Sequence, residues 1–312
     1  MRLRTRLERL AGPSAVAIGN FDGFHAGHRR IIEILSAQAR RRGLASVVLT
    51  FHPHPRVFFG HAIHLINTDA QRLEALKRQA LDRLFFIDFA SIVSCPAAGF
   101  VQDILLGCLD MQLLVSGGDF RFGCDRKGDL AYLQRQAAGR FTLIQAPDVE
   151  IDGCRVASSL IRKQLAAGAV RAAGRMLERP YFIDGVVIHG AGRGRTLGFP
   201  TLNIASDNTL LPPGVFRTQV DIAGRSFPSL TNIGRAPTFG AAALGSAQEC
   251  LPPAGVVPGG LKIETHVPDF RRTVYGKKVR LHFIDKIRDE KKFSDAGELA
   301  QQIRRDITSL GI

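Results

Sequence analysis

Short apolar runs alternate with segments of helical spacing through the first half of the chain. Each run is continuous, as in a strand that is buried on both faces of a parallel sheet. The runs cover residues 16–18, 45–51, 84–87, 113–116 and 141–144. Helical spacing extends to about Arg42 after the first run, and again over residues 68–83 and 96–108. This order of strands and helices predicts an α/β domain with a parallel sheet and right-handed crossovers.

The pattern changes near Pro180, where alternating apolar and polar positions replace helical spacing. Such alternation, interrupted by Gly and Pro, is typical of a small β-barrel. The predicted strands cover residues 181–188, 214–222, 227–233, 261–267 and 278–287. A helix follows from Ser294, because Leu299, Ile303 and Ile307 are spaced four apart. We therefore predict two domains, residues 1–179 and residues 180–312.

Composition indicates a folded chain and excludes several classes of protein. Hydrophobic residues make up 45% of the chain and charged residues 22%, which excludes a disordered protein. No apolar run approaches the length of a membrane span, so we expect no membrane partner. The basic first ten residues lack the apolar core of a secretory signal and are predicted to be a short lead-in. The five scattered cysteines have no C-x-x-C spacing, which favours a reducing, cytoplasmic location.

The net charge of +14 raises the alternative of a nucleic-acid-binding protein. A nucleic-acid arm concentrates its positive charge, whereas here the excess is spread over both halves. The chain has no Trp and three Tyr, so it offers few rings for base stacking. We therefore do not expect nucleic acid as a partner.

The first strand leads through a glycine-rich turn into the first helix. The residues of interest are Gly19, Phe21, Asp22 and Gly23 in the turn, and His25 and His28 at the start of the helix. Free N–H groups and the helix dipole make such a place an anion site. Both histidines can donate hydrogen bonds to phosphate oxygens. The alternative is that the histidines cap the helix and the glycines serve only the turn.

Three further segments are predicted near the carboxyl edge of the sheet, where open α/β sheets bind ligands. Residues 50–56 end the second strand, residues 117–123 form a glycine-rich loop, and residues 156–162 open a helix. The alternative for the loop is a tight turn with its phenylalanines in the core. A serine is expected as the helix N-cap. The candidate residues are Asp119, Phe120, Phe122, Ser158, Ser159 and Arg162.

Together, these four segments resemble the FMN adenylyltransferase module of bifunctional bacterial riboflavin kinase/FAD synthetases. The resemblance implies a Rossmann-like nucleotidyltransferase domain whose glycine-rich turn and serines bind ATP, with His25, His28 and Arg162 as catalytic residues. It also implies that the loop at 117–123 places the flavin. Three positions depart from the family pattern, namely His52, Gly118 and Leu160. They leave open an alternative in which the chain is a riboflavin kinase alone and the N-terminal domain only binds.

A second glycine-rich segment, residues 189–204, lies between the first two predicted barrel strands. Gly190 and Gly198 allow the backbone to approach an anionic ligand closely, and the alternative is a flexible surface hairpin. Thr201 and Asn203 offer hard oxygen ligands that suit Mg²⁺ on ATP phosphates. No G-K-[ST] is present, so this is not a P-loop.

The predicted strand at 261–267 presents Glu264 on its polar face. On this pattern alone, Glu264 would be a solvated surface residue. However, P-T-L-N at 200–203 and the E-x-H-x-x-D-F pattern from Glu264 are similar to the flavokinase family, which has a six-stranded antiparallel barrel. That resemblance implies Glu264 as general base and a flavin pocket that includes Asn232 and Arg288. Residues 241–260 are longer than the family's connection and are predicted to form a flexible loop.

Both resemblances, in this order, cover nearly the whole chain. They imply a bifunctional enzyme that phosphorylates riboflavin to FMN with ATP and then adenylylates FMN to FAD, releasing pyrophosphate. The expected partners are riboflavin, FMN and ATP, with Mg²⁺ as the metal. We expect a cytoplasmic monomer or weak homo-oligomer.

Overall fold

The computed structural model describes residues 1–190, 194, 198–235, 256–257, 260–291 and 293–308. They form two compact units, Met1–Ser158 and Ser159–Ile312, and each is described by itself. Most of the predicted loop at 241–260 lies outside the described residues. Within the described ranges, no helix is both long enough and apolar enough to cross a bilayer.

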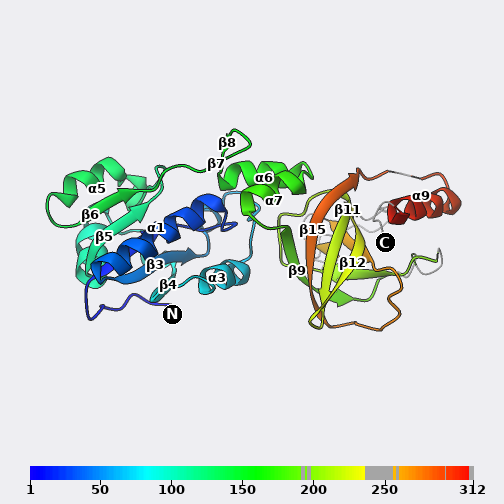
Figure 1. Ribbon diagram of the computed structural model, residues 1–312, viewed down its shortest axis with the longest axis horizontal. Helices are drawn as coiled ribbons and strands as arrows, with labels where there is room; N and C mark the ends of the chain where they lie inside the picture. Colours follow the sequence, from blue (N-terminus) through cyan, green and yellow to red (C-terminus); the bar gives the residue numbers. More distant parts are fainter. Residues whose placement is uncertain (191–193, 195–197, 236–255, 258–259, 292, 309–312) are drawn as a thin grey trace, which may run out of the picture. The chain divides into compact units, whose positions relative to one another are not determined.

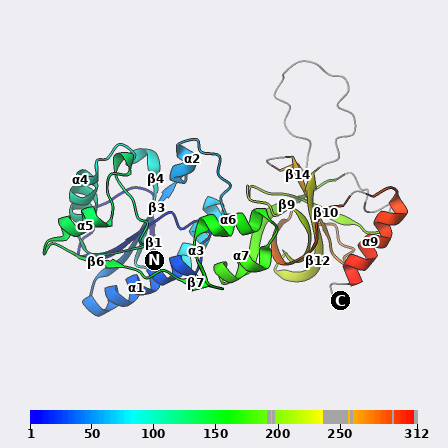
Figure 2. The ribbon, with the colours of Figure 1, turned by 90° about the horizontal axis from the view of Figure 1, so that it is seen from above.

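The first unit is built on a six-stranded parallel sheet (Figures 1 and 2). In spatial order its strands are β1 (Arg2–Arg4), β4 (Arg83–Asp88), β3 (Ala45–His52), β2 (Ser14–Ile18), β5 (Met111–Ser116) and β6 (Thr142–Gln145). The prediction of a parallel sheet is confirmed. The prediction that the N-terminus is only a lead-in is wrong, because β1 pairs with β4 and adds an edge strand.

Helices pack on both faces of this sheet. The α1 (Ala26–Arg42) and α3 (Asp69–Lys77) helices bury Leu35 and Leu76 against Ala15 and Ala17 of β2. On the other face, a π-helix (Phe100–Cys108) and α5 (Leu130–Ala137) pack in the cluster that contains Val16 of β2. Alternate residues of β2 therefore point into two separate apolar clusters. The shorter elements are α2 (Pro55–Phe58), α4 (Ala97–Gly99) and two 3₁₀ turns, Phe89–Ser91 and Cys124–Arg126.

Helix boundaries differ from the pattern-based ones in two places. The helix predicted over 68–83 ends at Lys77, because the chain turns there to bury Leu81 before β4 begins. The helix predicted over 96–108 is α4 followed by the π-helix, in which a Cβ on Gly107 would lie 3.1 Å from the Gln102 carbonyl oxygen. The capping box of Thr68 and Gln71 fixes the start of α3.

The second unit is a closed antiparallel barrel. Around the barrel the order is β10 (Thr201–Ala205), β9 (Tyr181–Ile188), β15 (Lys278–Arg288), β11 (Gly214–Ile222), β12 (Arg225–Arg235) and β14 (Leu261–His266). Pairing between β14 and β10 closes it, and β13 (Val256–Val257) adds to β14. Residues 201–205, expected in a loop, are therefore a strand that is hydrogen-bonded on both sides. The six-stranded barrel is confirmed.

Three helices lie wholly or almost wholly in the second unit. The terminal helix α9 (Ala296–Thr308) packs Ile303 and Ile307 against Val215 and Leu230, which confirms its predicted face. The other two are α6 (Ser158–Ala166) and α7 (Val170–Leu177). Contacts between α7 and β15 place the break between units earlier than Pro180. The domain boundary at 179/180 stays a prediction.

Candidate active sites

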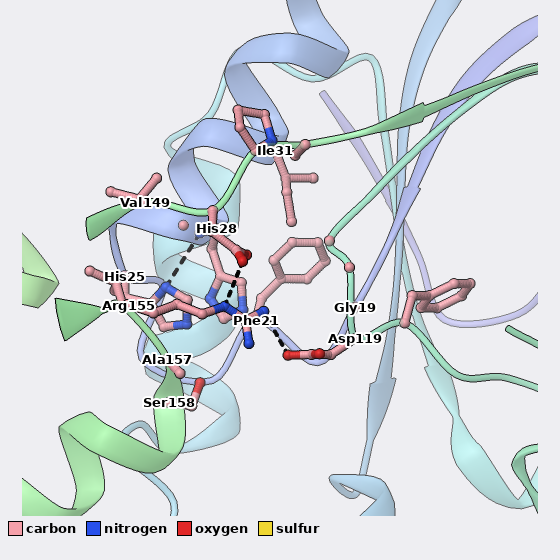
Figure 3. A pocket seen from close by; sticks show the side chains of 18 of the residues that line it. Gly19, Phe21, His25, His28, Ile31, Asp119, Val149, Arg155, Ala157 and Ser158 are labelled. Carbon is pink, nitrogen blue, oxygen red and sulfur yellow. Dashed lines mark hydrogen bonds and ion pairs between the residues drawn. The ribbon is translucent and has the colours of Figure 1, made fainter. Parts of the chain in front are cut away.

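A cavity of about 270 Å³ lies where β2 and β5 end and α1 begins (Figure 3). Seven of the predicted site residues line it: Gly19, Phe21, His25, His28, Asp119, Phe120 and Ser158. The cavity is thus at the carboxyl edge of the parallel sheet, as open α/β sheets position their ligand sites. The first turn of α1 contributes Gly27 and His28 to its wall.

His25 and His28 form a stacked pair at the start of α1, with ring centroids 3.7 Å apart. His25 is the N-cap, and its Nδ1 accepts a long hydrogen bond of 3.4 Å from the His28 backbone N–H. His25 therefore both caps the helix and lines the cavity. Burial, and secondarily His25, lowers the pKa of His28 well below 6.5, so its ring is neutral at pH 7. Within the described residues, the buried Nδ1 of His28 has no hydrogen-bond partner.

Arg155 is a cavity residue that the sequence analysis missed. Its Nη2 lies 2.7 Å from Asp119 Oδ2 and its Nε lies 2.9 Å from Asp148 Oδ2 (Figure 3). These hydrogen bonds raise the pKa of Arg155, so it is a permanent cation at the cavity wall. Arg155 follows a tight turn between β7 (Glu150–Ile151) and β8 (Cys154–Arg155). The Asp152-Gly153 pair was the available signal, since Asp-Gly favours a two-residue hairpin turn.

Three predicted residues lie next to the cavity without lining it. Asp22 is buried, and its carboxylate accepts hydrogen bonds from the backbone N–H groups of Ile66 and Asn67. Gly23 has φ +87°, which explains a glycine in this turn. Phe122 packs against Phe100, so it is a core residue, as the alternative reading of this loop expected. Phe120, in contrast, lines the cavity.

The predicted serines and arginine of α6 fall on both sides of the break between units. Ser158 is the first residue of the helix and donates a 2.9 Å hydrogen bond to the Asp22 carbonyl. Ser159 and Arg162 belong to the second unit, with Ser159 exposed and Arg162 half-buried. The expected serine N-cap is wrong by one position, because the helix already includes Ser158.

The departures from the family pattern have specific surroundings. His52 ends β3 and stacks on Phe86 at 5.0 Å between centroids. Gly118 lines the cavity, and a Cβ there would lie 3.1 Å from Gln145 Nε2. A larger residue at 118 would thus require Gln145 to shift. Leu160 is half-buried on α6.

In the barrel, Asn203, Glu264 and Asn232 lie in one row across three strands. Glu264 on β14 is directly opposite Asn203 on β10 and directly opposite Asn232 on β12. Opposite residues of an antiparallel pair point to the same face, so the three side chains share one face of the barrel wall. The other face of β14 buries Ile263 and Thr265, as the alternation predicted. Asn232 Oδ1 is buried and has no hydrogen-bond partner in the described part of the chain.

Gly190 makes room for the side chain of Asn203. A Cβ at residue 190 would lie 2.1 Å from Asn203 Nδ2 and 2.4 Å from its Cγ. Thr201 is two residues before Asn203 on β10 and therefore points to the same side of the strand. Gly198 has φ +84°, and a Cβ there would meet nothing within 4 Å.

Arg288 is engaged with the terminal helix. Its Nε and Nη2 lie 3.0 and 2.8 Å from Oδ2 of Asp306, a residue of α9 that is only 3% exposed. Phe293 also contacts its guanidinium, at 5.7 Å from the ring centroid. These contacts show an anchor for α9, a role that the sequence analysis did not foresee.

Comparison with known proteins matches both halves of the chain. A family model described as FAD synthetase matches residues 8–160, and one described as riboflavin kinase matches residues 177–310. A bifunctional riboflavin kinase/FMN adenylyltransferase of Pseudomonas fluorescens is 38% identical, covering 94% of this chain and 90% of the relative. The protein of that name from Bacillus subtilis is 31% identical, with the same coverages. A crystal structure described as a macrolide-efflux protein from Streptococcus pneumoniae superposes with a TM-score of 0.82 at 28% identity, covering 98% of this chain and 97% of that one.

Proposed function

Since this chain belongs to the bifunctional riboflavin kinase/FMN adenylyltransferase family, we propose that each of its two reactions uses one of the two sites described above. The enzyme phosphorylates riboflavin to FMN with ATP, and it adenylylates FMN to FAD with release of pyrophosphate. Because matches to both activities are present in one chain, the kinase-only and nucleic-acid alternatives are set aside.

Adenylylation is assigned to the cavity at the start of α1. An oxygen of the FMN phosphate attacks the α-phosphorus of ATP, and the bond from that phosphorus to the bridging oxygen breaks as pyrophosphate leaves. The FMN phosphate is itself the nucleophile, so alignment and charge stabilisation suffice. The first turn of α1 supplies a positive helix end to the leaving phosphates.

The two histidines act as hydrogen-bond donors in this proposal. Since Nδ1 of His25 accepts from the His28 N–H, the neutral His25 ring carries its proton on Nε2. That N–H can donate to a phosphate oxygen. His28 donates as a neutral ring, because its pKa is lowered by burial. Ser158, Ser159 and Arg162 are assigned to further phosphate contacts, and Asp119 and Phe120 to the flavin.

Phosphorylation of riboflavin is assigned to the row of Asn203, Glu264 and Asn232, the observation that carries this half of the proposal. Glu264 stands on a strand that is paired on both sides, so its backbone is held in place. It accepts the proton of the riboflavin 5′-hydroxyl while that oxygen attacks the γ-phosphorus of ATP and ADP leaves. The amide of Asn232 is assigned to the flavin substrate.

Mg²⁺ fits the donor chemistry beside this row. Thr201 and Asn203 offer neutral oxygens on the same side of β10, and Gly190 leaves space for the amide. The described residues contain no group of three or more His, Cys, Asp or Glu that could hold a metal. A protein that supplies two neutral oxygens leaves positions for water and phosphate oxygens, as Mg²⁺ prefers. Bound there, the ion would neutralise charge on the ATP phosphates.

A product assay with two variants tests this division. The parent chain is incubated with riboflavin, ATP and Mg²⁺, and flavins are separated over time; a second assay starts from added FMN. We expect Glu264→Gln to slow FMN formation by about 10²–10⁴-fold, the usual contribution of a general base, and to leave FAD formation from FMN unchanged. His28→Gln should give the opposite pattern. Loss of both reactions in either variant contradicts the assignment of separate sites.

We also propose a cytoplasmic location and a monomer or weak homo-oligomer. The described cysteines, Cys95, Cys108, Cys124 and Cys154, are free thiols, which supports a reducing compartment. Sedimentation across a range of protein concentrations measures the oligomeric state.

A further inference from the structure

Arg72 has the largest fully buried side chain among the described residues, and it has no part in the reactions assigned above. It lies on α3 and is 1% exposed. Burial lowers its pKa, an effect that Asp69 and Asp22 oppose. Burying a guanidinium is costly unless its N–H groups find acceptors. Its acceptors therefore indicate why an arginine is there.

The guanidinium joins the ends of two neighbouring strands. Nη1 donates a 2.8 Å hydrogen bond to the carbonyl of Asn20, two residues after the end of β2. Nη2 donates to the carbonyl of Phe51, near the end of β3, at 2.7 Å. Nη2 also lies 2.7 Å from Asp69 Oδ1, and the guanidinium is 5.2 Å from the centroid of the Phe86 ring.

The Asn20 carbonyl belongs to the turn that carries the adenylylation site. The next residue, Phe21, has φ +51°, a conformation that non-glycine residues rarely adopt. Phe21 lines the cavity and meets the His28 ring edge-on, with centroids 5.2 Å apart. Arg72 thus contacts the Asn20 carbonyl, Asn20 is bonded to Phe21, and Phe21 contacts His28.

We propose that Arg72 is a positioning residue for FMN adenylylation. One planar guanidinium reaches a backbone carbonyl in the turn after β2, a backbone carbonyl of β3 and a carboxylate, and thereby holds the turn of His25 and His28 against the end of β3. A lysine ammonium is a single point charge on a flexible stem and cannot reproduce this fork. A simple core role would be filled as well by an apolar side chain of similar volume.

Chemical rescue tests the proposal. Arg72→Ala is assayed for FAD formation from added FMN, with and without guanidinium chloride at non-denaturing concentrations. We expect kcat to fall by about 10- to 100-fold, as for a misplaced catalytic group, with a smaller change in KM for ATP. Guanidinium should restore part of kcat, whereas sodium chloride or urea at the same concentration should not. Riboflavin phosphorylation by the same preparation is the internal control and should stay at the parent rate.

Amide exchange in β2 and β3 separates positioning from folding. If Arg72→Ala keeps parent-like protection there and guanidinium restores nothing, the proposal is wrong. If Arg72→Ala loses amide protection in β2 and β3, Arg72→Lys is measured in the same way. An Arg72→Lys variant that keeps this protection but has a reduced kcat for FAD formation supports a positioning role. A Lys variant that forms FAD at the parent rate overturns it.

Discussion

Replacing Gly190 with alanine should disable the kinase reaction by moving one amide. The new Cβ would lie 2.1 Å from Asn203 Nδ2, whereas ordinary contacts begin at 3.4 Å. The difference requires the amide to move by more than about 1 Å, and such a misplacement costs about 100-fold in rate, or about 2.7 kcal/mol. Gly190 is outside the left-handed region, so alanine brings no backbone strain. The displaced group is a side-chain end, so the barrel should remain folded.

The assay follows riboflavin to FMN, and FMN to FAD, in separate reactions. Gly190→Ala should lower kcat/KM of the first reaction by about 100-fold and leave the second unchanged. Gly12→Ala is the matched control, because a Cβ there would meet nothing within 4 Å. In an Asn203→Ala background, adding Gly190→Ala should cost little, since the amide it would displace is gone. Parent-like kinase activity in Gly190→Ala, or additive losses in the double variant, would refute this reasoning.

Three further results are expected. The pKa of His28 is lowered in the folded state, so the unfolded chain binds a proton at this residue more readily as the pH falls. The melting temperature should therefore fall as the pH drops below about 6.5, and it should fall less in His28→Gln. Urea unfolding should show that Arg288→Met costs about 3–5 kcal/mol, because buried Asp306 then keeps the Gln302 amide but loses its cation. The Arg288→Met/Asp306→Leu double variant should recover part of this loss, and no recovery would contradict the ion pair. Phe122→Ala should cost about 3–5 kcal/mol of stability, whereas Phe120→Ala should mainly raise KM for FMN; reversed effects would contradict their placement.

Much of the fold follows from local pattern, and the exceptions share a cause. The continuous apolar runs predicted β2 to β6, because such runs are stable only when both faces are covered. β1 and β10 were missed because Arg2–Arg4 and Thr201–Ala205 are too short to show a pattern of their own. Each is a strand through pairing with partners far away in the sequence. The π-helix likewise could not be told from an α-helix by spacing alone.

The site shows the same division between local and long-range information. By itself, the sequence determined which chemical groups are available: two histidines at a helix start, a Thr and Asn of oxygen-ligand type, and a glutamate on a strand. Tertiary structure decided which of them meet. The register of three strands brings Asn203, Glu264 and Asn232 into one row, and a hairpin brings Arg155 to Asp119. The three strands of the row come from segments far apart in the sequence, and Arg155 and Asp119 are 36 residues apart, so no single local segment shows that these groups meet.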